Sequence, residues 1–382
     1  MRTPHFIAEA ELSSPGFLPL PALLLAGCLI SGCLTMTGFA AETPALPARN
    51  GTLSIPAQEW RYRPGPRQIK VYLYYPQGEL KHVTATTGLM LSLHNWGGTA
   101  ATGTANPQQL ADRYNVVAIC VDYLQSGPQS VKGPEPYDFG YLQALDALRA
   151  LWTVFDGLDR AGIAFDRQRI FSTGGSGGGN VTLMVNKLAP RTFTCIIDMC
   201  GMARLSDDIA YHLPGGSGLD ARYSADPDSP NFLTPDEQQL RDVGDPSQLA
   251  VARKLGNTCK VIVVHGTTDT SCLVEDAQRM VNNMRKAGFD VEGHFITDED
   301  LDGKALKTTG HALGNRTLIV FQKGDAYLLP DSPQALRRKT KTDFELRDEV
   351  RYPTAGGAFV ISYKEGFPVG RFDPQDKKQP AR

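Results

Sequence analysis

The sequence lacks an excess of charge of either sign. Its 382 residues include 39 Lys and Arg against 41 Asp and Glu, which gives a net charge of -2. A general attraction to nucleic acid or to anionic membranes is therefore excluded. The sequence also contains no C-x-x-C motif and no paired-histidine spacing of the kind that binds zinc, and no internal repeat. We expect no metal, no organic cofactor and no nucleic-acid partner.

Charge is absent altogether from residues 17–41, which are rich in Leu, Ala and Gly. The segment ends in Gly38-Phe39-Ala40-Ala41, a small-residue pattern typical of signal-peptide cleavage. We expect residues 1–41 to be a signal peptide and the protein to be secreted or periplasmic. Cys28 and Cys33 each end a lipobox-like sequence, so a lipoprotein is the alternative. The segment is also long enough for an uncleaved membrane anchor, and lipidation or an uncleaved signal would be the only reason to expect membrane contact.

Cysteine is scarce in the rest of the chain. Five cysteines follow the predicted cleavage site, and an odd number leaves at least one free or intermolecular. An oxidising compartment permits disulfides. Cys195 and Cys259 lie near the starts of expected neighbouring strands. Cys200 and Cys272 lie near the ends of such strands, and the sequence leaves both pairings open.

Apolar strands alternate with amphipathic helices through most of the chain. The expected strands are 68–75, 88–94, 115–121, 169–171, 192–199, 260–265 and 291–296. The expected helices are 107–114, 138–159 with Asp138 as N-cap, a helix after Ser176 that stops before Pro190, 249–255, 272–287 and 315–321. This alternation predicts an α/β fold with a doubly wound, mostly parallel sheet and helices on both faces.

A glycine-rich turn, Gly174-Gly175-Ser176-Gly177-Gly178, joins an apolar strand to a helical pattern. A Walker loop would need Lys and then Ser or Thr after its last glycine, and the G-x-G-x-x-G dinucleotide spacing is not met. The turn fits G-x-S-x-G, in which a strained bend exposes a serine hydroxyl at the top of a parallel sheet. Ser176 is therefore the predicted nucleophile.

An acid is expected next along the chain, because hydrolases with this elbow follow the order Ser, acid, His. Asp269 comes directly after the apolar stretch 260–265 and would orient an imidazole and stabilise its cation. The alternative for Asp269 is a helix N-cap. Asp298 and Asp300, which follow the next strand, are the alternative acids.

The base is expected beyond the last core strand. His311 lies there in a loop, next to Gly310, and completes the order. His94 and His265 end apolar strands and are interpreted as structural histidines, and His294 lies inside a strand.

Donors for an oxyanion are expected in two places. The Gly177 N–H follows the nucleophile directly, and the loop 94–98, His-Asn-Trp-Gly-Gly, follows a buried strand. Two aimed donors are what a tetrahedral intermediate requires. We predict the Trp96 N–H as the second donor, with Asn95 as the alternative. Asn95 and Tyr123, which follows the strand 115–121, are the predicted substrate-binding residues.

These motifs resemble the α/β-hydrolase superfamily, and within it the dienelactone-hydrolase, prolyl-oligopeptidase and secreted-esterase branch. The matching segments are 94–98, 166–170 leading into 174–178, 265–269 and 310–311. The resemblance implies a serine hydrolase that cleaves a small-molecule or polymer-borne carboxylic ester through an acyl-enzyme. A prolyl-oligopeptidase-like peptidase and a non-catalytic envelope or binding protein are the alternatives.

The domain organisation follows from composition. Residues 42–66 are a Pro-rich arm with an edge strand at 52–55, and residues 67–325 are the catalytic domain. Within it, residues 201–246 break the rhythm and are interpreted as a cap-like insertion after the strand that follows the elbow. Residues 326–382 are an extension with a hairpin at 345–352 and 357–363.

The insertion leaves three interpretations open. It is a solvated surface excursion, a calcium site among Asp220, Asp226 and Asp228, or a cap that shapes a pocket. The cap interpretation depends on the aromatic and histidine side chains of the insertion, which are Tyr211, His212, Tyr223 and Phe232.

Overall fold

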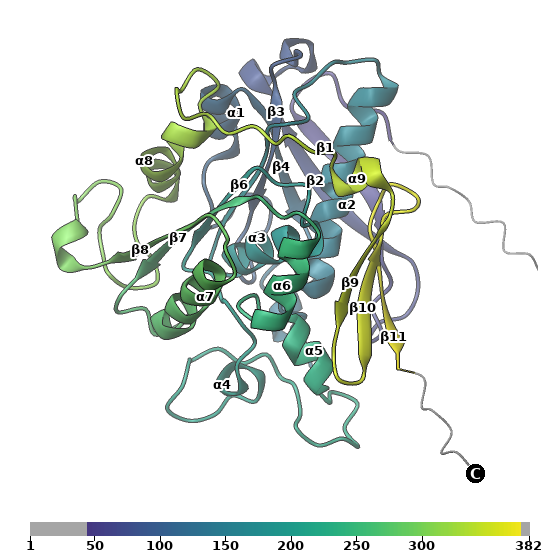
Figure 1. Cartoon of the computed structure of the whole chain (residues 1–382), viewed down its shortest axis with the longest axis vertical. Helices are drawn as coiled ribbons and strands as arrows, with labels where there is room; N and C mark the ends of the chain where they lie inside the picture. The colour runs from purple at the N-terminus through teal and green to yellow at the C-terminus, as the bar shows by residue number, and fades with distance from the viewer. Residues whose placement is uncertain (1–43, 376–382) are drawn as a thin grey trace, which may run out of the picture. The chain divides into compact units, whose positions relative to one another are not determined.

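An eight-stranded sheet forms the centre of the structure, a computed structural model that describes residues 44–375 (Figure 1). The predicted signal peptide, residues 1–41, lies outside the described residues. The strands are β1 (Gly51–Ala57), β2 (Arg67–Tyr74), β3 (Gly88–Leu93), β4 (Val116–Asp122), β5 (Ile170–Gly175), β6 (Cys195–Met199), β7 (Lys260–Gly266) and β8 (Val291–Ile296). Their order is β1-β2-β4-β3-β5-β6-β7-β8. Strand β2 is antiparallel to β1 and to β4, and β3 to β8 run parallel. The predicted mostly parallel sheet is confirmed.

Helices cover both faces of this sheet, because its central strands are apolar on both sides. The helices are α1 (Pro107–Tyr114), α2 (Tyr141–Arg160), α3 (Gly177–Leu188), α4 (Asp207–Ala210), α5 (Pro235–Leu240), α6 (Pro246–Lys254), α7 (Val274–Lys286), α8 (Arg316–Leu328) and α9 (Asp343–Leu346). Short 3-10 helices are η1 (Pro76–Gly78), η2 (Leu80–His82), η3 (Ser130–Lys132) and η4 (Asp298–Asp300). Neighbouring residues of β3 show the two faces. Leu89 and Leu91 pack in the core formed with α2, α3, α6 and α7, whereas Met90 packs in the separate core formed with α1 and α8.

No helix among residues 44–375 is long and apolar enough to span a membrane.

Helix α2 begins later than predicted, and Asp138 is not its N-cap. The N-cap is Gly140, with a φ of 91° that favours glycine. The Gly140 N–H donates to Gln143 Oε1 at 2.9 Å. Asp138 still serves the first turn, because its carboxylate accepts from the Gln143 N–H at 3.0 Å. The correction moves the start of the helix to Tyr141 and leaves Asp138 buried beneath it.

The C-terminal region forms a second sheet of three antiparallel strands, in the order β11-β10-β9. Its strands are β9 (Glu349–Pro353), β10 (Gly357–Ser362) and β11 (Val369–Pro374). The predicted hairpin corresponds to β9 and β10, and β11 was not predicted. Apolar side chains of the sheet belong to the same core as α2 and α3, namely Val350, Tyr352, Phe359 and Ile361. The Tyr363 hydroxyl donates to the Leu188 carbonyl at 3.1 Å and so holds the region against the end of α3.

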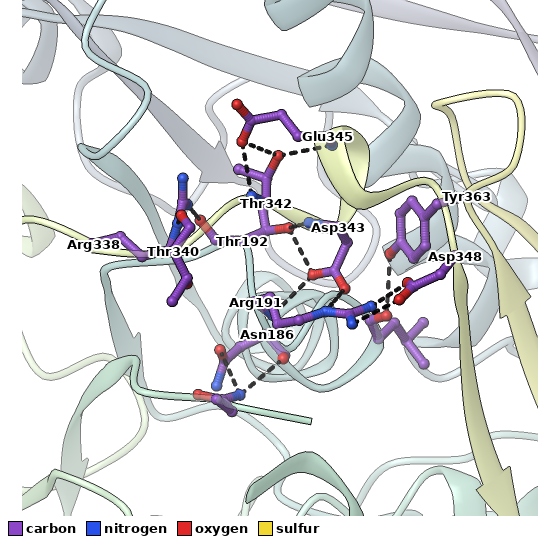
Figure 2. A network of polar contacts seen from close by, with 12 residues as sticks. Asn186, Arg191, Thr192, Arg338, Thr340, Thr342, Asp343, Glu345, Asp348 and Tyr363 are labelled. Carbon is purple, nitrogen blue, oxygen red and sulfur yellow. Dashed lines mark hydrogen bonds and ion pairs between the residues drawn. The ribbon is translucent and has the colours of Figure 1, made fainter. Parts of the chain in front are cut away.

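A buried polar network also fixes this region to the turn between α3 and β6 (Figure 2). Asp343 is fully buried and accepts hydrogen bonds from Arg191 N at 2.8 Å, Arg191 Nε at 2.7 Å and Thr192 Oγ1 at 2.9 Å. Arg338 Nη1 donates to the Thr192 carbonyl at 2.6 Å. Arg191 also reaches Asp348, through Nη1 at 3.0 Å. The guanidinium of Arg191 is thus held between two carboxylates of the C-terminal region.

Replacing Asp343 is expected to destabilise the protein strongly. Asp343→Ala leaves the Arg191 guanidinium, the Arg191 N–H and the Thr192 hydroxyl without their acceptor, and breaking a buried ion pair costs about 3–5 kcal/mol. Urea unfolding measures the loss. The matched control is Arg351→Ala, because Arg351 also forms an ion pair, with Asp373 at 2.8 Å, but its side chain is 53% exposed. That change is expected to cost at most about 1 kcal/mol. Equal effects of the two substitutions would contradict the anchoring function of Asp343.

Candidate active site

Ser176 lies in a tight turn between β5 and α3. Its φ of 56° and ψ of -119° lie in a region that residues with a side chain rarely adopt. The turn also lies directly against neighbouring backbone. A Cβ atom at Gly178 would stand 2.1 Å from the Leu93 carbonyl oxygen, and one at Gly174 would stand 2.2 Å from the Gly178 carbonyl oxygen. Only glycine fits at these two positions, which accounts for the glycines around the serine.

The structure brings the three predicted triad residues together. His311 Nε2 lies 2.8 Å from Ser176 Oγ, and His311 Nδ1 lies 2.8 Å from Asp269 Oδ2. A carboxylate only accepts, so Nδ1 carries the proton and Nε2 is left to accept the serine proton. The other oxygen of Asp269 accepts from the Ser271 N–H at 2.8 Å and the Cys272 N–H at 3.0 Å. Asp269 therefore both closes its own loop and orients His311. It is not a helix N-cap, because α7 begins at Val274 and its N-cap is Leu273.

A second histidine contacts the same carboxylate. His265, at the end of β7, is fully buried, and its Nε2 lies 2.7 Å from the Cys272 carbonyl oxygen and 3.4 Å from Asp269 Oδ2. Because a carbonyl oxygen only accepts, Nε2 carries a proton and points it at both oxygens. Burial by itself raises the pKa of Asp269, but hydrogen bonds from His265, His311 and Cys272 outweigh it and hold the pKa well below its usual range. Asp269 is therefore a carboxylate over the whole working pH range.

Removing this second donor is expected to weaken the site without abolishing it. His265→Leu loses one hydrogen bond to a charged group, which corresponds to about a tenfold or greater drop in kcat/KM for an ester substrate. The pKa of Asp269 rises because a donor to its charged form is lost, but it starts so low that Asp269 stays ionised, and the loss comes from poorer orientation of His311. His265→Gln keeps a donor and is expected to recover part of the activity. An unchanged kcat/KM in a folded His265→Leu protein would contradict a supporting function of this contact.

The alternative acids lie elsewhere. Asp298 and Asp300 are exposed residues of η4, and Asp300 Oδ2 accepts from the Thr297 N–H at 2.8 Å. His94 is structural, as expected: it is fully buried, and its ring nitrogens lie 2.7 Å from the Asn95 carbonyl oxygen and 2.7 Å from Ser126 Oγ. Burial lowers the pKa of His94 to about 4, so its imidazole is neutral near pH 7.

The two predicted oxyanion donors lie next to each other. A Cβ atom at Gly177 would stand 2.6 Å from the Trp96 backbone nitrogen, so these segments are in direct contact. Gly177 is the first residue of α3, where backbone N–H groups have no acceptor within the helix. Across residues 44–375 the Trp96 N–H has no hydrogen-bond acceptor either. Both amides are free beside Ser176, and their catalytic function remains a prediction.

Of the two predicted substrate-binding residues, Tyr123 is buried and Asn95 is partly buried. Tyr123 is only 1% exposed, its ring stacks on His94 with centroids 4.0 Å apart, and its hydroxyl donates to the His94 carbonyl. It therefore supports the loop from beneath and does not face a substrate, which corrects the prediction. Asn95 is partly buried, and its side chain fills the space beside two glycines. A Cβ atom would stand 2.5 Å from the Asn95 side chain at Gly98 and 2.6 Å from it at Gly103.

The insertion lies against the Trp96 side of the site. The Trp96 ring stacks on Tyr137 with centroids 3.8 Å apart, and both belong to one apolar cluster with Phe139 and Cys272. The insertion contributes most of the remaining cluster, namely Met202, Leu205, Ile209, Ala210, Ala221, Tyr223 and Leu233. Of the side chains expected to line a pocket, Tyr223 is buried, Tyr211 and Phe232 are partly buried, and His212 is exposed.

The insertion is also tied to α3 by a buried lysine. Lys187 Nζ donates to the carbonyl oxygens of Leu240 and Asp242, each at 2.7 Å. Burial lowers the pKa of Lys187 to about 7. Removal of the insertion would leave this amine buried without its acceptors.

Two groups of potential metal ligands occur among the described residues, and both contain Asp269. Within each group the ligand atoms lie within 4.8 Å of one another: Cys200, His265 and Asp269 in one, and Asp269, Cys272 and His311 in the other. A metal ion at either place would compete for the carboxylate of Asp269, which also holds His311. Asp220 and Asp226, two of the acids considered for calcium, instead accept from the Arg222 N–H at 2.8 Å and the Asp228 N–H at 3.0 Å.

All five cysteines in the part of the chain described by the structure are free and buried. Neither of the disulfide pairings left open by the sequence is formed.

Two further polar residues beside the site were not predicted. Asp198, at the end of β6, is fully buried, accepts from the Gly201 N–H at 2.9 Å and has a pKa raised to about 7 by burial. Arg316 lies across the nucleophile turn, since a Cβ atom at Gly175 would collide with its guanidinium, and its Nη1 donates to the Gly103 carbonyl. The only signal in the sequence is that Asp198 interrupts an otherwise apolar strand; Arg316 offers none.

Sheet order, nucleophile turn and the chain order Ser176, Asp269, His311 together define the α/β-hydrolase fold. The chain belongs to the family described as "Protein of unknown function (DUF2920)", whose model matches residues 131–366. No curated protein matches the chain.

Solved structures with a similar fold include peptidases. The Pyrococcus horikoshii acylaminoacyl peptidase is 12% identical, with a TM-score of 0.49, over 75% of this chain and 43% of its own. A Mycobacterium tuberculosis puromycin-hydrolyzing peptidase is 15% identical, with a TM-score of 0.44, over 72% of this chain and 38% of its own. A putative dipeptidyl aminopeptidase IV from Bacteroides ovatus is 13% identical, with a TM-score of 0.47, over 74% of this chain and 36% of its own. The chain spans less than half the length of these structures.

Proposed function

We propose that the protein is a serine hydrolase that cleaves a carboxylic ester through an acyl-enzyme. The observation that carries the proposal is the continuous hydrogen-bonded chain from Ser176 Oγ through His311 to Asp269, with both spacings at 2.8 Å. A nucleophile, a base and an orienting acid within hydrogen-bond reach are the arrangement that activates a serine hydroxyl.

The reaction follows from the positions of these atoms. Ser176 Oγ attacks the carbonyl carbon of the ester while His311 Nε2 takes its proton. The carbonyl oxygen becomes an oxyanion, and the N–H groups of Trp96 and Gly177 stabilise it. His311 then gives the proton to the departing alkoxide, which leaves as an alcohol. Water repeats the sequence on the acyl-enzyme and releases the acid. Asp269 stays ionised throughout and stabilises the imidazolium form of His311.

An activity-based experiment tests the proposal directly. The protein is treated with a fluorophosphonate probe, and its turnover of p-nitrophenyl acetate is compared with that of aminoacyl p-nitroanilides. We expect labelling of Ser176, located by peptide mass spectrometry, and a higher kcat/KM for the ester. A higher kcat/KM for the amides would replace the esterase proposal by the peptidase alternative. Absence of both labelling and turnover would favour the non-catalytic alternative.

We also propose that the insertion shapes the acyl or alcohol pocket. Support comes from the shared cluster that joins the insertion to Trp96 and Cys272. Tyr211, which is partly buried and packs against this cluster, is the side chain to change, because loss of the whole insertion would disturb Lys187. Tyr211→Ala is expected to spare acetyl-ester hydrolysis and to alter the ranking of longer acyl esters. An unchanged ranking would leave the insertion without a function in specificity.

We propose export from the cytoplasm on the basis of residues 17–41. The protein purified from its source is expected to begin near Ala41 or Glu42, which intact mass spectrometry decides. A diacylglyceryl adduct on Cys28 or Cys33 would instead establish a lipoprotein.

A further inference from the structure

A cleft of about 310 Å³ lies where three segments outside the α/β core meet. Its lining comes from the N-terminal arm, the insertion and the C-terminal sheet, together with the first turn of α2. Six aromatic side chains line it, namely Trp60, Tyr62, Tyr141, Tyr223, Phe359 and Phe372. Six charged residues line it as well, namely Glu59, Arg61, Asp138, Glu237, Arg241 and Arg371. A concave site of this size that combines aromatic rings with polar groups is suited to a small ligand.

The rings are fixed by contacts with one another. Trp60 and Tyr62 meet edge to face with centroids 5.3 Å apart, and Tyr141 and Phe359 do so at 5.5 Å. Phe372 lies 4.9 Å from Phe359 and is 39% exposed, which is unusual for so large an apolar side chain. A ligand meets rigid, partly exposed aromatic surface here.

Two tyrosine hydroxyls in this cleft have no partner in the part of the chain that the structure describes. The Tyr223 side chain is buried apart from 8% of its surface, and its hydroxyl makes no hydrogen bond to residues 44–375. The hydroxyl oxygen itself is not among the buried unpaired atoms of these residues, so it is open to the cleft. The Tyr141 hydroxyl is likewise unpaired there. The absence of a side chain at Gly370 leaves room for it, since a Cβ atom would stand 2.4 Å from the Tyr141 hydroxyl oxygen. Each hydroxyl can donate one hydrogen bond and accept others, so both are available to a ligand in the cleft.

The charged groups around the cleft are mostly neutralised within the protein. Arg61 pairs with Glu237 at 2.9 Å. Arg241 donates from Nε to the Asp138 carbonyl oxygen at 2.6 Å, and its Nη2 lies 3.4 Å from the Asp138 carboxylate. An ionic ligand would therefore meet few free counter-charges, whereas a neutral ligand would leave the existing pairs intact.

We propose that this cleft binds a neutral carbohydrate. A sugar ring presents C–H groups on its faces, which stack on the negative faces of aromatic rings, and hydroxyl groups at its rim, which both donate and accept. The aromatic side chains of the cleft stack on the faces of the sugar ring, and the hydroxyls of Tyr223 and Tyr141 form hydrogen bonds with the hydroxyl groups at its rim. The proposal rests on this cleft alone and is independent of the hydrolase activity.

Binding is tested with the full-length protein carrying Ser176→Ala, so that turnover does not interfere. The probes are cellohexaose, xylohexaose, mannohexaose and maltohexaose, with hexagalacturonate as the charged comparison, measured by calorimetry. We expect at least one neutral probe to bind more tightly than hexagalacturonate. Loss of one hydrogen bond in Tyr223→Phe is expected to weaken it about five- to tenfold.

Phe372→Ala provides a second variant that does not disturb a buried residue, and it is expected to weaken binding to a similar degree. The matched control is Leu318→Ala, an exposed apolar residue on α8 at 37% exposure, which should leave binding unchanged. Failure of all four neutral probes to bind overturns the proposal, and so does tighter binding of hexagalacturonate. Binding that neither Tyr223→Phe nor Phe372→Ala weakens overturns the location. If Tyr223→Phe does not fold, the binding measured for Phe372→Ala decides whether the ligand occupies this cleft.

Discussion

Ser176→Ala is expected to abolish ester hydrolysis, with a fall in kcat of about 10⁶-fold, because no other group in the triad can form the acyl-enzyme. The fold should survive, since the turn is shaped by the close approach of Gly174 and Gly178 to neighbouring backbone and not by the serine side chain. Release of p-nitrophenol from p-nitrophenyl acetate measures the loss, and circular dichroism checks the fold.

The matched control is Ser247→Ala, an exposed serine on α6. It should label with fluorophosphonate and turn over ester at the wild-type rate. Labelling of Ser176→Ala at the wild-type rate would place the nucleophile elsewhere.

His311→Ala is expected to lose nearly as much activity as Ser176→Ala, because residues that act as a unit are not additive. Without the imidazole, Ser176 has no group within 2.8 Å to take its proton. The double variant should be hardly worse than either single one. Steady-state kinetics over a range of pH values measure all three.

His294→Ala is the matched histidine control. His294 lies on β8, 3.5 Å from Glu292 and apart from the triad, so its loss should leave kcat close to the wild-type value. A larger fall in kcat for His294→Ala than for His311→Ala would show that the base has been wrongly assigned.

The sheet and the three triad residues could be predicted because they depend on local patterns. Apolar runs such as 88–93 and 260–266 have one physical explanation, a strand buried on both faces. The proximity of Ser176 and Asp269 then follows because the ends of parallel strands meet at one edge of the sheet, and His311 completes the chain order Ser, acid, His. Such arguments need only the sequence and the direction of each strand.

The contacts of buried side chains could not be predicted in this way. Tyr123 and His265 both follow or end apolar strands, as functional residues often do, yet the first supports a loop and the second touches the triad acid. The position of a residue in a strand predicts which edge of the sheet the residue lies at, but it does not predict which residue its side chain contacts. Strand β11 and the position of Arg316 over Gly175 depend on packing between segments far apart in the chain.

The anchoring of Asp343 has a consequence for how the protein assembles. Asp343 and Thr192 are 151 residues apart, and Arg191 and Asp348 are 157 apart. Contacts between such distant residues must wait for the closure of a long loop, so they form slowly compared with the helices and turns of the core. The helix that begins at the nucleophile therefore receives its last supports only when the C-terminal region has been synthesised and has docked. A fully supported catalytic centre therefore belongs to a late stage of folding, after residues 343–348 have docked.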